Sequence, residues 1–267
     1  MTKKVLITGS TDGIGLEAAR LLVEAGHLVL LHGRNPAKLE RAEQALSALP
    51  GDGLVEGYVA DLSRMADVEA LAAAVAARHA SLDVLINNAG VYATRDAVTA
   101  DGLDVRFVVN TIAPFLLTRR LLPLLGTTGR VINLSSAAQA PVDPAALAGQ
   151  GRLSDGAAYA QSKLALTMWS RHLALALADD GPAVIAVNPG SMLGSKMVKE
   201  AFGVAGGDLG IGAGILARAA LADEFATASG QYFDNDSGQF AAPHRDALDP
   251  RKCEEVVGAI ETILAAG

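Results

Sequence analysis

A chain of 267 residues, with 51% hydrophobic and only 19% charged residues, can bury one sizeable core, so we expect a single domain over residues 1–267. The formal net charge of -7, without a cluster of Lys and Arg, argues against a nucleic-acid partner and favours small molecules. The single cysteine, Cys253, suits a reducing compartment, and no signal peptide or membrane-spanning stretch is recognisable, so we expect a cytoplasmic protein that does not bind membranes.

The first expected strand, Val5–Ile7, is joined by a glycine-rich turn, Thr8–Gly15, to a helix that begins near Ile14. The glycines permit a sharp turn, the approach of a ligand to bare backbone, and close packing of the helix on the strand. The amides at the helix start and the helix dipole suit a pyrophosphate, although a turn without a ligand is the alternative. The candidate phosphate-binding residues are Gly9, Ser10, Thr11, Gly13, Ile14 and Gly15. Their Gly-x3-Gly-x-Gly spacing resembles that of the short-chain dehydrogenase/reductase family.

Beyond this turn, short β-branched or Leu-rich runs alternate with longer Ala/Leu-rich segments of helical periodicity. This alternation predicts an α/β fold of the Rossmann type, a doubly wound parallel sheet of about seven strands between two layers of helices. The expected strands are 5–7, 28–31, 54–59, 84–86, 130–134, 184–187 and 232–233. The expected helices begin near residue 14 and then cover 36–49, 65–79, 102–124, 157–179 and 250–265.

The end of the second strand, His32–Asn35, carries no carboxylate to bind a ribose 2'-hydroxyl. Arg34 stands there instead, and its guanidinium matches the geometry of a 2'-phosphate, which favours NADP(H) over NAD(H). A solvated loop arginine is the alternative, and Asp12 in the phosphate loop would repel a 2'-phosphate if it pointed inward. We assign His32 to packing or to the surface.

Polar and small residues also follow the third and fourth strands, where ligands of open α/β sheets bind. Asp61 and Leu62 resemble the family's adenine-contacting pair, whereas an Asp after a strand is otherwise more often a turn or cap residue. The fourth strand ends in Asn87–Gly90, whose small residues would let a ribose lie against the backbone. The candidate residues in this segment are Asn88, Ala89 and Gly90.

The clearest chemical signal is Tyr159-Ala160-Gln161-Ser162-Lys163 in the helix at 157–179, because positions four apart share one helix face. Moving a Tyr pKa from ~10 toward ~7 requires roughly 4 kcal/mol at about 1.36 kcal/mol per unit. An ammonium about 4 Å away supplies about that much at an effective dielectric of ~20. We therefore expect Lys163 to lower the pKa of Tyr159, and an ordinary exposed Tyr/Lys pair is the alternative.

A serine pair, Ser135 and Ser136, ends the fifth strand and places a hydroxyl where it can donate to a substrate oxygen. The family resemblance favours Ser136. Its spacing to Tyr159 is 23 residues, about ten more than usual in the family, and residues 142–155 look like an insertion similar to that of the retinol-dehydrogenase-like branch. A serine acyl-transfer nucleophile is the rival interpretation, but the chain has no Gly-x-Ser-x-Gly elbow and no well-placed histidine base.

Two further motifs complete the candidate site. Asn110 lies within a predicted helix before Pro114, and the resemblance implies that it holds a water linking Lys163 to solvent; an exposed Asn at a proline kink is the alternative. After the sixth strand, the resemblance places Pro189 and Gly190 over the nicotinamide. Gly194 stands where the family often has Thr, so we expect the neighbouring Ser195 to supply that hydroxyl.

The resemblance covers residues 3 to about 195 and implies an oxidoreductase that transfers a hydride between NADP(H) and an alcohol/carbonyl substrate. Tyr159 would be its general acid/base, and no metal is expected. The alternative is a non-catalytic NADP(H)-binding scaffold or sensor. The joint presence of Asn110, Ser136, Tyr159 and Lys163 argues against that alternative, because a binding module does not need all four.

Residues 191–215 are expected to form a substrate lid, since Gly206, Gly207 and Gly210 make this segment flexible. Apolar residues in the lid, Met192, Met197 and Phe202, suggest an apolar substrate. The two long helices at 102–124 and 157–179 flank one side of the sheet in the family and commonly pair with a twofold mate, so we expect a homodimer or homotetramer.

Overall fold

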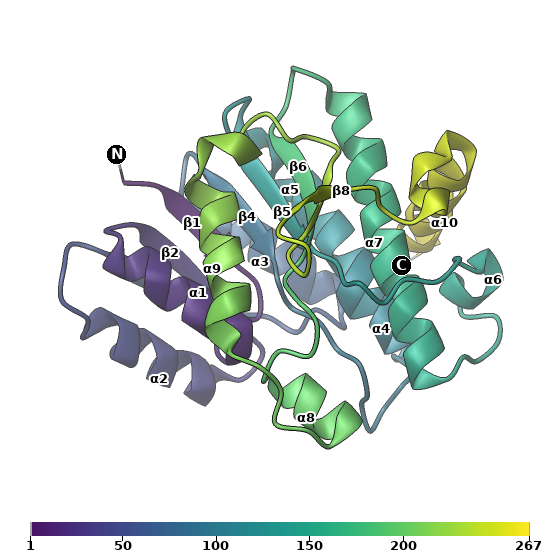
Figure 1. The fold of residues 1–267 in the computed structure, drawn as a ribbon, viewed down its shortest axis with the longest axis horizontal. Helices are drawn as coiled ribbons and strands as arrows, with labels where there is room; N and C mark the ends of the chain where they lie inside the picture. The colour runs from purple at the N-terminus through teal and green to yellow at the C-terminus, as the bar shows by residue number, and fades with distance from the viewer. Residues whose placement is uncertain (1, 267) are drawn as a thin grey trace.

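An eight-stranded sheet runs through the centre of the computed structural model, which describes residues 2–266, apart from the side chains of residues 201 and 202 (Figure 1). The strand order is β3-β2-β1-β4-β5-β6-β7-β8, and only the last pair is antiparallel. The strands are β1 (Lys4–Ile7), β2 (Leu28–Gly33), β3 (Leu54–Val59), β4 (Val84–Asn87), β5 (Arg130–Leu134), β6 (Ala183–Asn188), β7 (Tyr232–Asp234) and β8 (Gln239–Ala241). The predicted three-layer, doubly wound fold is confirmed, with β8 as an unexpected antiparallel edge.

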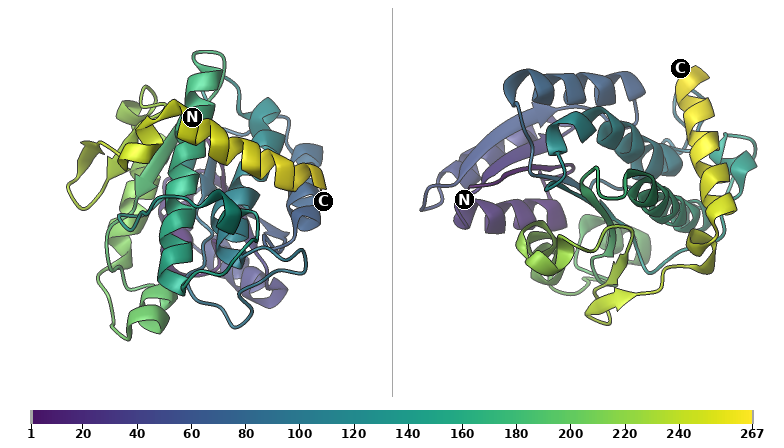
Figure 2. Two further views of the ribbon diagram at one scale, coloured as in Figure 1. Left: turned by 90° about the vertical axis from the view of Figure 1, so that its right-hand side faces the viewer. Right: turned by 90° about the horizontal axis from the view of Figure 1, so that it is seen from above.

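Helices cover both faces of this sheet (Figures 1 and 2). They are α1 (Gly13–Glu24), α2 (Pro36–Ser47), α3 (Met65–Arg78), α4 (Val105–Phe107), α5 (Ala113–Leu125), α6 (Pro144–Leu147), α7 (Asp155–Leu177), α8 (Lys196–Phe202), α9 (Leu209–Leu221) and α10 (Pro250–Ala266). A π-helical turn, η1 (Val108–Ile112), and two 3-10 turns, η2 (Asp223–Phe225) and η3 (Arg245–Leu248), complete the set. α6 lies within the insertion predicted at 142–155.

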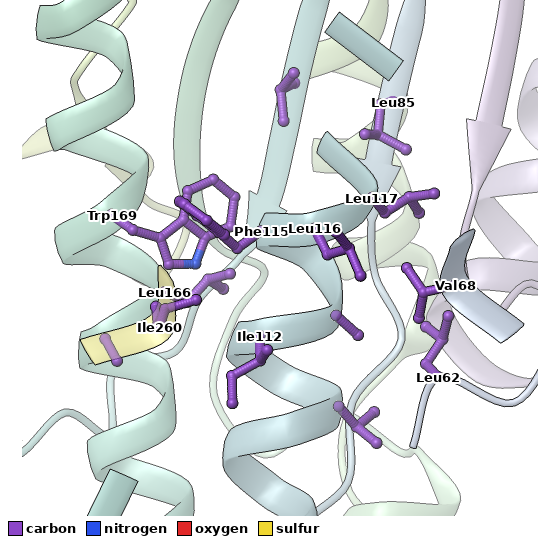
Figure 3. Close-up of a cluster of buried hydrophobic side chains, with 14 of the residues drawn as sticks. Leu62, Val68, Leu85, Ile112, Phe115, Leu116, Leu117, Leu166, Trp169 and Ile260 are labelled. Carbon is purple, nitrogen blue, oxygen red and sulfur yellow. The ribbon is translucent and has the colours of Figure 1, made fainter. Parts of the chain in front are cut away.

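Two apolar clusters hold the layers together, one on each face of the sheet. One includes residues of α3, α5, α7 and α10, and the other includes residues of α1, α2 and α9. In the first cluster the ring of Trp169 meets Phe115 edge-on, with ring centroids 5.6 Å apart (Figure 3). Trp169 is fully buried in α7, so this packing fixes the helix that also carries Tyr159 and Lys163.

Helix α9 was not predicted, because its Gly-rich sequence was assigned to the lid. Its buried face, which includes Ala213 and Leu216, packs against α1. A Cβ added at Gly212 would fall 2.6 Å from a methyl carbon of Leu193 and 3.2 Å from Ile14, so this glycine permits close packing. Residues 209–215 therefore belong to a core helix, and only the segment before them remains at the surface as a candidate lid.

The helix predicted at 102–124 is divided into α4, η1 and α5. Pro114 has no N–H to donate to the carbonyl of Asn110, four residues earlier, and the π turn η1 lies where the helical ladder loses this bond. By length and composition, Val105–Leu125 could cross a membrane, but 72% of its apolar 18-residue window is buried inside the protein. That burial is typical of a core helix.

The C-terminal helix α10 lies across α7 (Figure 2). Arg119 of α5 forms an ion pair with Glu261 of α10, so the outer side of these helices is tied to the end of the same chain. Assembly through the helices at 102–124 and 157–179 stays a prediction. A twofold mate on this side would meet α10 as well as α5 and α7.

Candidate functional site

A cavity of about 1060 Å³ runs along the carboxyl edge of the sheet. It crosses the boundary between β1 and β4, where the order of the strands reverses and open α/β sheets bind their ligands. One end lies at Arg34 after β2, and the other lies at Tyr159 and the segment that follows β6. We call these the Arg34 end and the Tyr159 end. Four inter-strand steps of about 4.8 Å separate β2 from β6, about 19 Å in all.

Most of the predicted site residues line this cavity. They are Gly9, Thr11, Gly13, Ile14, Gly15, Arg34, Asp61, Leu62, Asn88, Ala89, Gly90, Ser136, Tyr159, Lys163, Pro189, Gly190 and Ser195. Ser10 is different, because its side chain is fully buried and its Oγ donates to the Ile7 carbonyl at 2.9 Å. The same oxygen accepts from the His32 amide at 2.9 Å, so the Ser10 hydroxyl holds the loop onto β2.

The glycine loop leaves its backbone bare toward the cavity. Gly9 has a φ of 66°, and a Cβ there would fall 2.9 Å from the Ala89 Cα. A Cβ at Gly15 would fall 2.4 Å from Asn88 Nδ2. Both positions therefore require glycine, because the loop packs closely against Asn88 and Ala89, while Gly13 leaves bare backbone at the cavity, where an added Cβ would meet nothing within 4 Å.

Asn88 binds the loop from the side of β4. Its Nδ2 donates to the Thr8 carbonyl at 2.8 Å and to the Gly9 carbonyl at 3.0 Å. The Thr8 hydroxyl in turn accepts from the amides of Asn88 and Ala89, at 3.0 and 3.1 Å. These four hydrogen bonds join the ends of the first and fourth strands, and they fix the shape of the anion site.

His32 forms part of the cavity floor. Its Nδ1 accepts from the Gly9 amide at 3.1 Å, so its Nε2 carries the proton and donates to the Ala60 carbonyl at 3.1 Å. Burial lowers the pKa of His32 to about 4, which keeps the ring neutral and its Nδ1 an acceptor at neutral pH. Sequence analysis assigned His32 to packing or the surface and missed this contact with the loop.

Two cations stand at the Arg34 end. Arg34 is exposed beside the cavity, and Lys38, from the first turn of α2, also lines it. Lys38 Nζ lies 3.6 Å from Asp12 Oδ2, while Asp12 Oδ1 accepts from the Gly13 amide at 2.8 Å as the N-cap of α1. Asp12 is thus partly neutralised, which reduces the repulsion expected from it. Lys38 was not identified from the sequence.

Asp61 has the turn role that was the alternative, and its contact with adenine stays a prediction. Its Oδ1 accepts from the amide and the hydroxyl of Ser63, at 3.0 and 2.8 Å, so it shapes the turn after β3. It also lines the cavity. Leu62 is 5% exposed, and it reaches the core cluster as well as the cavity wall (Figure 3).

At the Tyr159 end, α7 presents Tyr159 and Lys163 on one face, as their spacing predicted. Lys163 Nζ lies 5.7 Å from the centroid of the Tyr159 ring and donates to the Leu134 carbonyl at 2.6 Å. Burial lowers the pKa of Lys163 to about 8. It raises the pKa of Tyr159, and a hydrogen bond with Ser136 opposes that rise.

The predicted lowering of the Tyr159 pKa is therefore wrong. The calculation assumed an ammonium about 4 Å from the phenol oxygen in a polar medium. Lys163 instead lies 4% exposed with its Nζ bonded to Leu134, and desolvation of the phenolate outweighs the hydrogen bond with Ser136, which would lower the pKa of Tyr159. Tyr159 consequently stays protonated at neutral pH.

The two serines after β5 have different environments. Ser135 is 3% exposed, and its hydroxyl is bonded to Thr167 Oγ1 at 2.7 Å. Ser136 is less buried, its Oγ accepts from the Ala138 amide at 3.1 Å, and its hydroxyl lowers the pKa of the neighbouring Tyr159 phenol. The Ser136 carbonyl accepts from Gln139 Nε2 at 2.8 Å and from the Tyr232 hydroxyl at 3.2 Å. This arrangement supports Ser136 as the residue beside the phenol.

Asn110 is 1% exposed in η1, so the alternative of an exposed Asn at a kink is wrong. Its Oδ1 accepts from the Val91 amide at 2.8 Å, and its Nδ2 donates to the Val91 carbonyl at 3.0 Å and to Ser162 Oγ at 3.0 Å. The side chain stands behind the cavity wall. A Cβ at Gly90 would lie 3.4 Å from Asn110 Oδ1 and 3.5 Å from Lys163 Nζ, so Gly90 keeps the space between them open.

Comparison with known proteins agrees with this geometry. The family model described as short chain dehydrogenase matches residues 3–205. The chain belongs to the short-chain dehydrogenase family. Its insertion and similarity assign it to the retinol-dehydrogenase-like branch: bovine retinol dehydrogenase 12 is 37% identical over 204 residues, covering 75% of this chain. The match spans 64% of that relative's length, slightly less than two thirds.

Solved structures give the same result for the fold. A crystal structure of an uncharacterized protein from Mycobacterium paratuberculosis superposes with a TM-score of 0.81 at 29% identity, covering 98% of this chain and 92% of that one. The Pseudomonas aeruginosa RhlG/NADP active-site complex has a TM-score of 0.72 at 27% identity, covering 88% and 95%. This short-chain dehydrogenase therefore shares its fold with both solved structures over most of its own length.

The rim of the short-chain dehydrogenase cavity contains residues that the sequence analysis did not single out. The ring of Tyr92, in the loop after β4, lies 5.1 Å from that of Tyr159 between centroids. A Cβ at Gly156 would fall 3.2 Å from the Tyr92 hydroxyl, so glycine at the start of α7 makes room for this phenol. An aromatic residue in a loop gave no periodic signal from which its position could be predicted.

The segment after β6 forms the opposite wall. Ser195 caps α8, with its Oγ accepting from the Val198 amide at 3.2 Å, and it keeps its own O–H as a donor. A Cβ at Gly194 would fall 2.7 Å from the Gly207 carbonyl, which explains why this position has no side chain. Met192 and Met197 line the cavity, whereas the Phe202 side chain lies outside the described residues. Among residues 2–266, no cluster of three His, Cys, Asp or Glu side chains could hold a metal.

Proposed function

We propose that this protein is an oxidoreductase that transfers a hydride between NADP(H) and an alcohol/carbonyl substrate. The observation that carries this proposal is the cavity itself. It joins a bare glycine loop and two exposed cations at one end to a Tyr, a Lys and a Ser at the other. A site for a small ligand alone would need only one of these two ends, which lie about 19 Å apart.

The residues of the cavity fit a phosphorylated dinucleotide. Gly13 lines the cavity with no atom within 4 Å of an added Cβ, and Gly9 and Gly15 let the loop pack tightly beside it, as a phosphate cradle requires. The amides of α1 and its dipole suit the pyrophosphate, and Arg34 with Lys38 suits a 2'-phosphate. Asp61 and Asn88–Gly90 would hold the adenosine and ribose parts, and Pro189, Gly190 and Ser195 the nicotinamide. When bound, NADP(H) supplies or accepts the hydride.

The chain's own residues handle the proton. Tyr159 carries the proton that the substrate oxygen gains in reduction and loses in oxidation. Its raised pKa keeps the phenol protonated at neutral pH, which is the form that reduction needs. Ser136 donates a hydrogen bond to the same oxygen, a contribution typically worth ~10²–10³ in rate.

Lys163 restores the proton of Tyr159. A lysine with a pKa of about 8 exchanges protons readily near neutral pH, whereas an ordinary lysine would stay charged. Asn110 fixes the Val91 loop and, with a water beside Gly90, connects Lys163 to solvent. Lys163 also has free donor capacity for the nicotinamide ribose, since an ammonium has three N–H groups.

The substrate would enter between Tyr92, Met192 and Met197, which suits an apolar molecule. The relative named retinol dehydrogenase 12 is consistent with that class. Residues 191–208, including α8, act as the lid over a single domain of residues 1–267. A cytoplasmic location without membrane binding, and a homodimer or homotetramer, complete the proposal.

The test is the loss of absorbance at 340 nm when NADPH is mixed with the protein and a panel of aldehydes, ketones and quinones. We expect turnover with at least one apolar carbonyl compound and tenfold weaker use of NADH. A protein that binds NADPH tightly but oxidises it with no member of the panel would favour the scaffold or sensor function instead.

A further inference from the structure

The turn between β7 and β8, Asp234–Ser237, packs against the chain that leaves β6. It lies outside the residues matched by the family model. Asp236 Oδ1 accepts from the Ser191 amide at 2.8 Å, and Oδ2 accepts from Ser191 Oγ at 2.5 Å and from Asn188 Nδ2 at 2.9 Å. One carboxylate thus holds both ends of the segment Asn188–Ser191.

Neighbouring side chains of the turn add to this contact. Asn235 Nδ2 donates to the Pro189 carbonyl at 2.9 Å, and Asp234 Oδ1 accepts from Asn188 Nδ2 at 2.8 Å. Asn188 is 1% exposed, so its amide needs these partners inside the protein.

The segment Asn188–Ser191 has a long internal hydrogen bond, from the Gly190 amide to Asn188 Oδ1 at 3.3 Å, and the turn supplies the shorter bonds described above. Gly190 has a φ of 120°, and a glycine restricts its backbone less than any other residue. Burial alone would raise the pKa of Asp236, but the hydrogen bonds from Ser191 and Asn188 outweigh it and lower the pKa. The carboxylate therefore stays charged at neutral pH, and charge-assisted hydrogen bonds of this kind are the strong ones.

We propose that Asp236 is a positioning residue that acts through Ser191 and Asn188 to hold the segment Asn188–Ser191 against the nicotinamide half of NADP(H). This inference rests on the proposed function. It follows from the position of the segment at the Tyr159 end, where β6 ends beside β5 and Ser136. Arg34 follows β2, which lies four strands from β6, and none of the hydrogen bonds of the turn named above involves the Arg34 end.

Two probes separate the halves of the cavity. NADPH spans both ends, whereas adenosine 2',5'-bisphosphate has the 2'-phosphate and adenosine but no nicotinamide. Asp236→Asn keeps the volume and turns one acceptor oxygen into an N–H donor that faces the donors of Ser191 and Asn188. We expect its Kd for NADPH to rise roughly tenfold, about 1.4 kcal/mol, and its Kd for the bisphosphate to stay within about twofold.

The matched control is Ser237→Ala in the same turn, because the Ser237 hydroxyl donates to the Asp234 carbonyl within the turn itself. It should bind both probes like the parent. If Asp236→Asn does not fold, Ser191→Ala decides, since Ser191 is exposed and loses only its Oγ bond to Asp236. Its NADPH affinity should fall by roughly threefold, again without a change for the bisphosphate.

Titration of each variant by fluorescence or calorimetry gives the outcome. An unchanged NADPH affinity in Asp236→Asn, or an equal loss for both probes, overturns the positioning role. In the case where only Ser191→Ala folds, the same two results in that variant overturn it. If the parent protein binds neither probe, the proposed function itself is contradicted. If the parent binds both probes and the affinities of the variant are unchanged, only the positioning role is contradicted.

Discussion

The two ends of the cavity hold their charges in opposite ways. At the Arg34 end, Lys38 and Asp12 have side chains that are 46% and 60% exposed, and Arg34 is exposed as well. At the Tyr159 end, the charged group is Lys163, which is 4% exposed. Burial disfavours the charged form of a lysine and lowers its pKa.

This difference separates binding from chemistry. An exposed cation attracts a phosphate but is screened by salt and contributes modestly. A buried lysine with its pKa lowered to about 8, beside a tyrosine whose pKa is raised, can move protons near neutral pH. We therefore expect substitutions at the Tyr159 end to change turnover and those at the Arg34 end to change affinity.

The largest expected effect is that of Tyr159→Phe, which removes only the ionisable hydroxyl. Turnover should fall by roughly 10²-fold or more, in line with the contribution of a positioned acid, while the Kd for NADPH stays within a few-fold. Steady-state rates at 340 nm and fluorescence titration measure the two quantities. Tyr58→Phe is the matched control, because the Tyr58 hydroxyl lies outside the cavity, 3.1 Å from His79 Nε2, and its loss should leave turnover near that of the parent. Near-normal turnover in Tyr159→Phe would remove the tyrosine from the mechanism.

Lys163→Met should differ from the parent in how its unfolding free energy depends on pH. The pKa of Lys163 falls from 10.5 to about 8 on folding, so the burial penalty is fully present below pH 8 and disappears as pH rises toward 10.5. The parent should gain about 2 kcal/mol in unfolding free energy over Lys163→Met between pH 7 and pH 9.5. Urea unfolding of both proteins at the two pH values measures this gain. A constant difference between them would show that Lys163 is not desolvated as described.

Arg34→Ala should change cofactor choice and nothing at the Tyr159 end. The parent should bind NADP(H) at least tenfold tighter than NAD(H), about 1.4 kcal/mol, and the variant should lose most of that preference. Its maximal rate at saturating cofactor should stay near that of the parent. Arg251→Ala, at an 87% exposed arginine of α10, serves as the control. Equal affinity of the parent for both cofactors would contradict the assignment of Arg34.

The smallest effect is expected from dilution, because both ends of the cavity come from one chain. Light scattering at micromolar concentration should give two or four times the chain mass of 27.3 kDa, while the rate per chain stays constant as the protein is diluted. A mass near 27 kDa would rule out the predicted assembly. The helix α10, which lies over α7, would then be the physical reason.

The strand ends were predictable because their signals are local. A glycine loop after an apolar run, a Tyr and a Lys four apart, and alternating elements each follow from backbone geometry or period. These signals predict from the sequence alone that Gly9, Arg34, Tyr159 and Lys163 lie along the carboxyl edge of the sheet. The fold class followed from the same alternation.

The remainder depends on tertiary contacts. The role of His32 arises from a bond to Gly9, 23 residues away, and no local pattern indicates it. The pKa of Tyr159 depends on how much water the fold removes, which sequence spacing alone does not give. Helix α9 was missed because its sequence has the glycine content of a flexible lid, whereas Gly212 permits close packing on Ile14 and Leu193.

The central claim, hydride transfer at the Tyr159 end, is tested most directly by isotope transfer. NADPH deuterated at the transferring position of nicotinamide C4 is incubated with the protein and the most reactive carbonyl compound of the panel, and the product is analysed by mass spectrometry. The account predicts one deuterium on the former carbonyl carbon of the alcohol product. Oxidation of NADPH without deuterium in the product, or no oxidation with any compound, would contradict it.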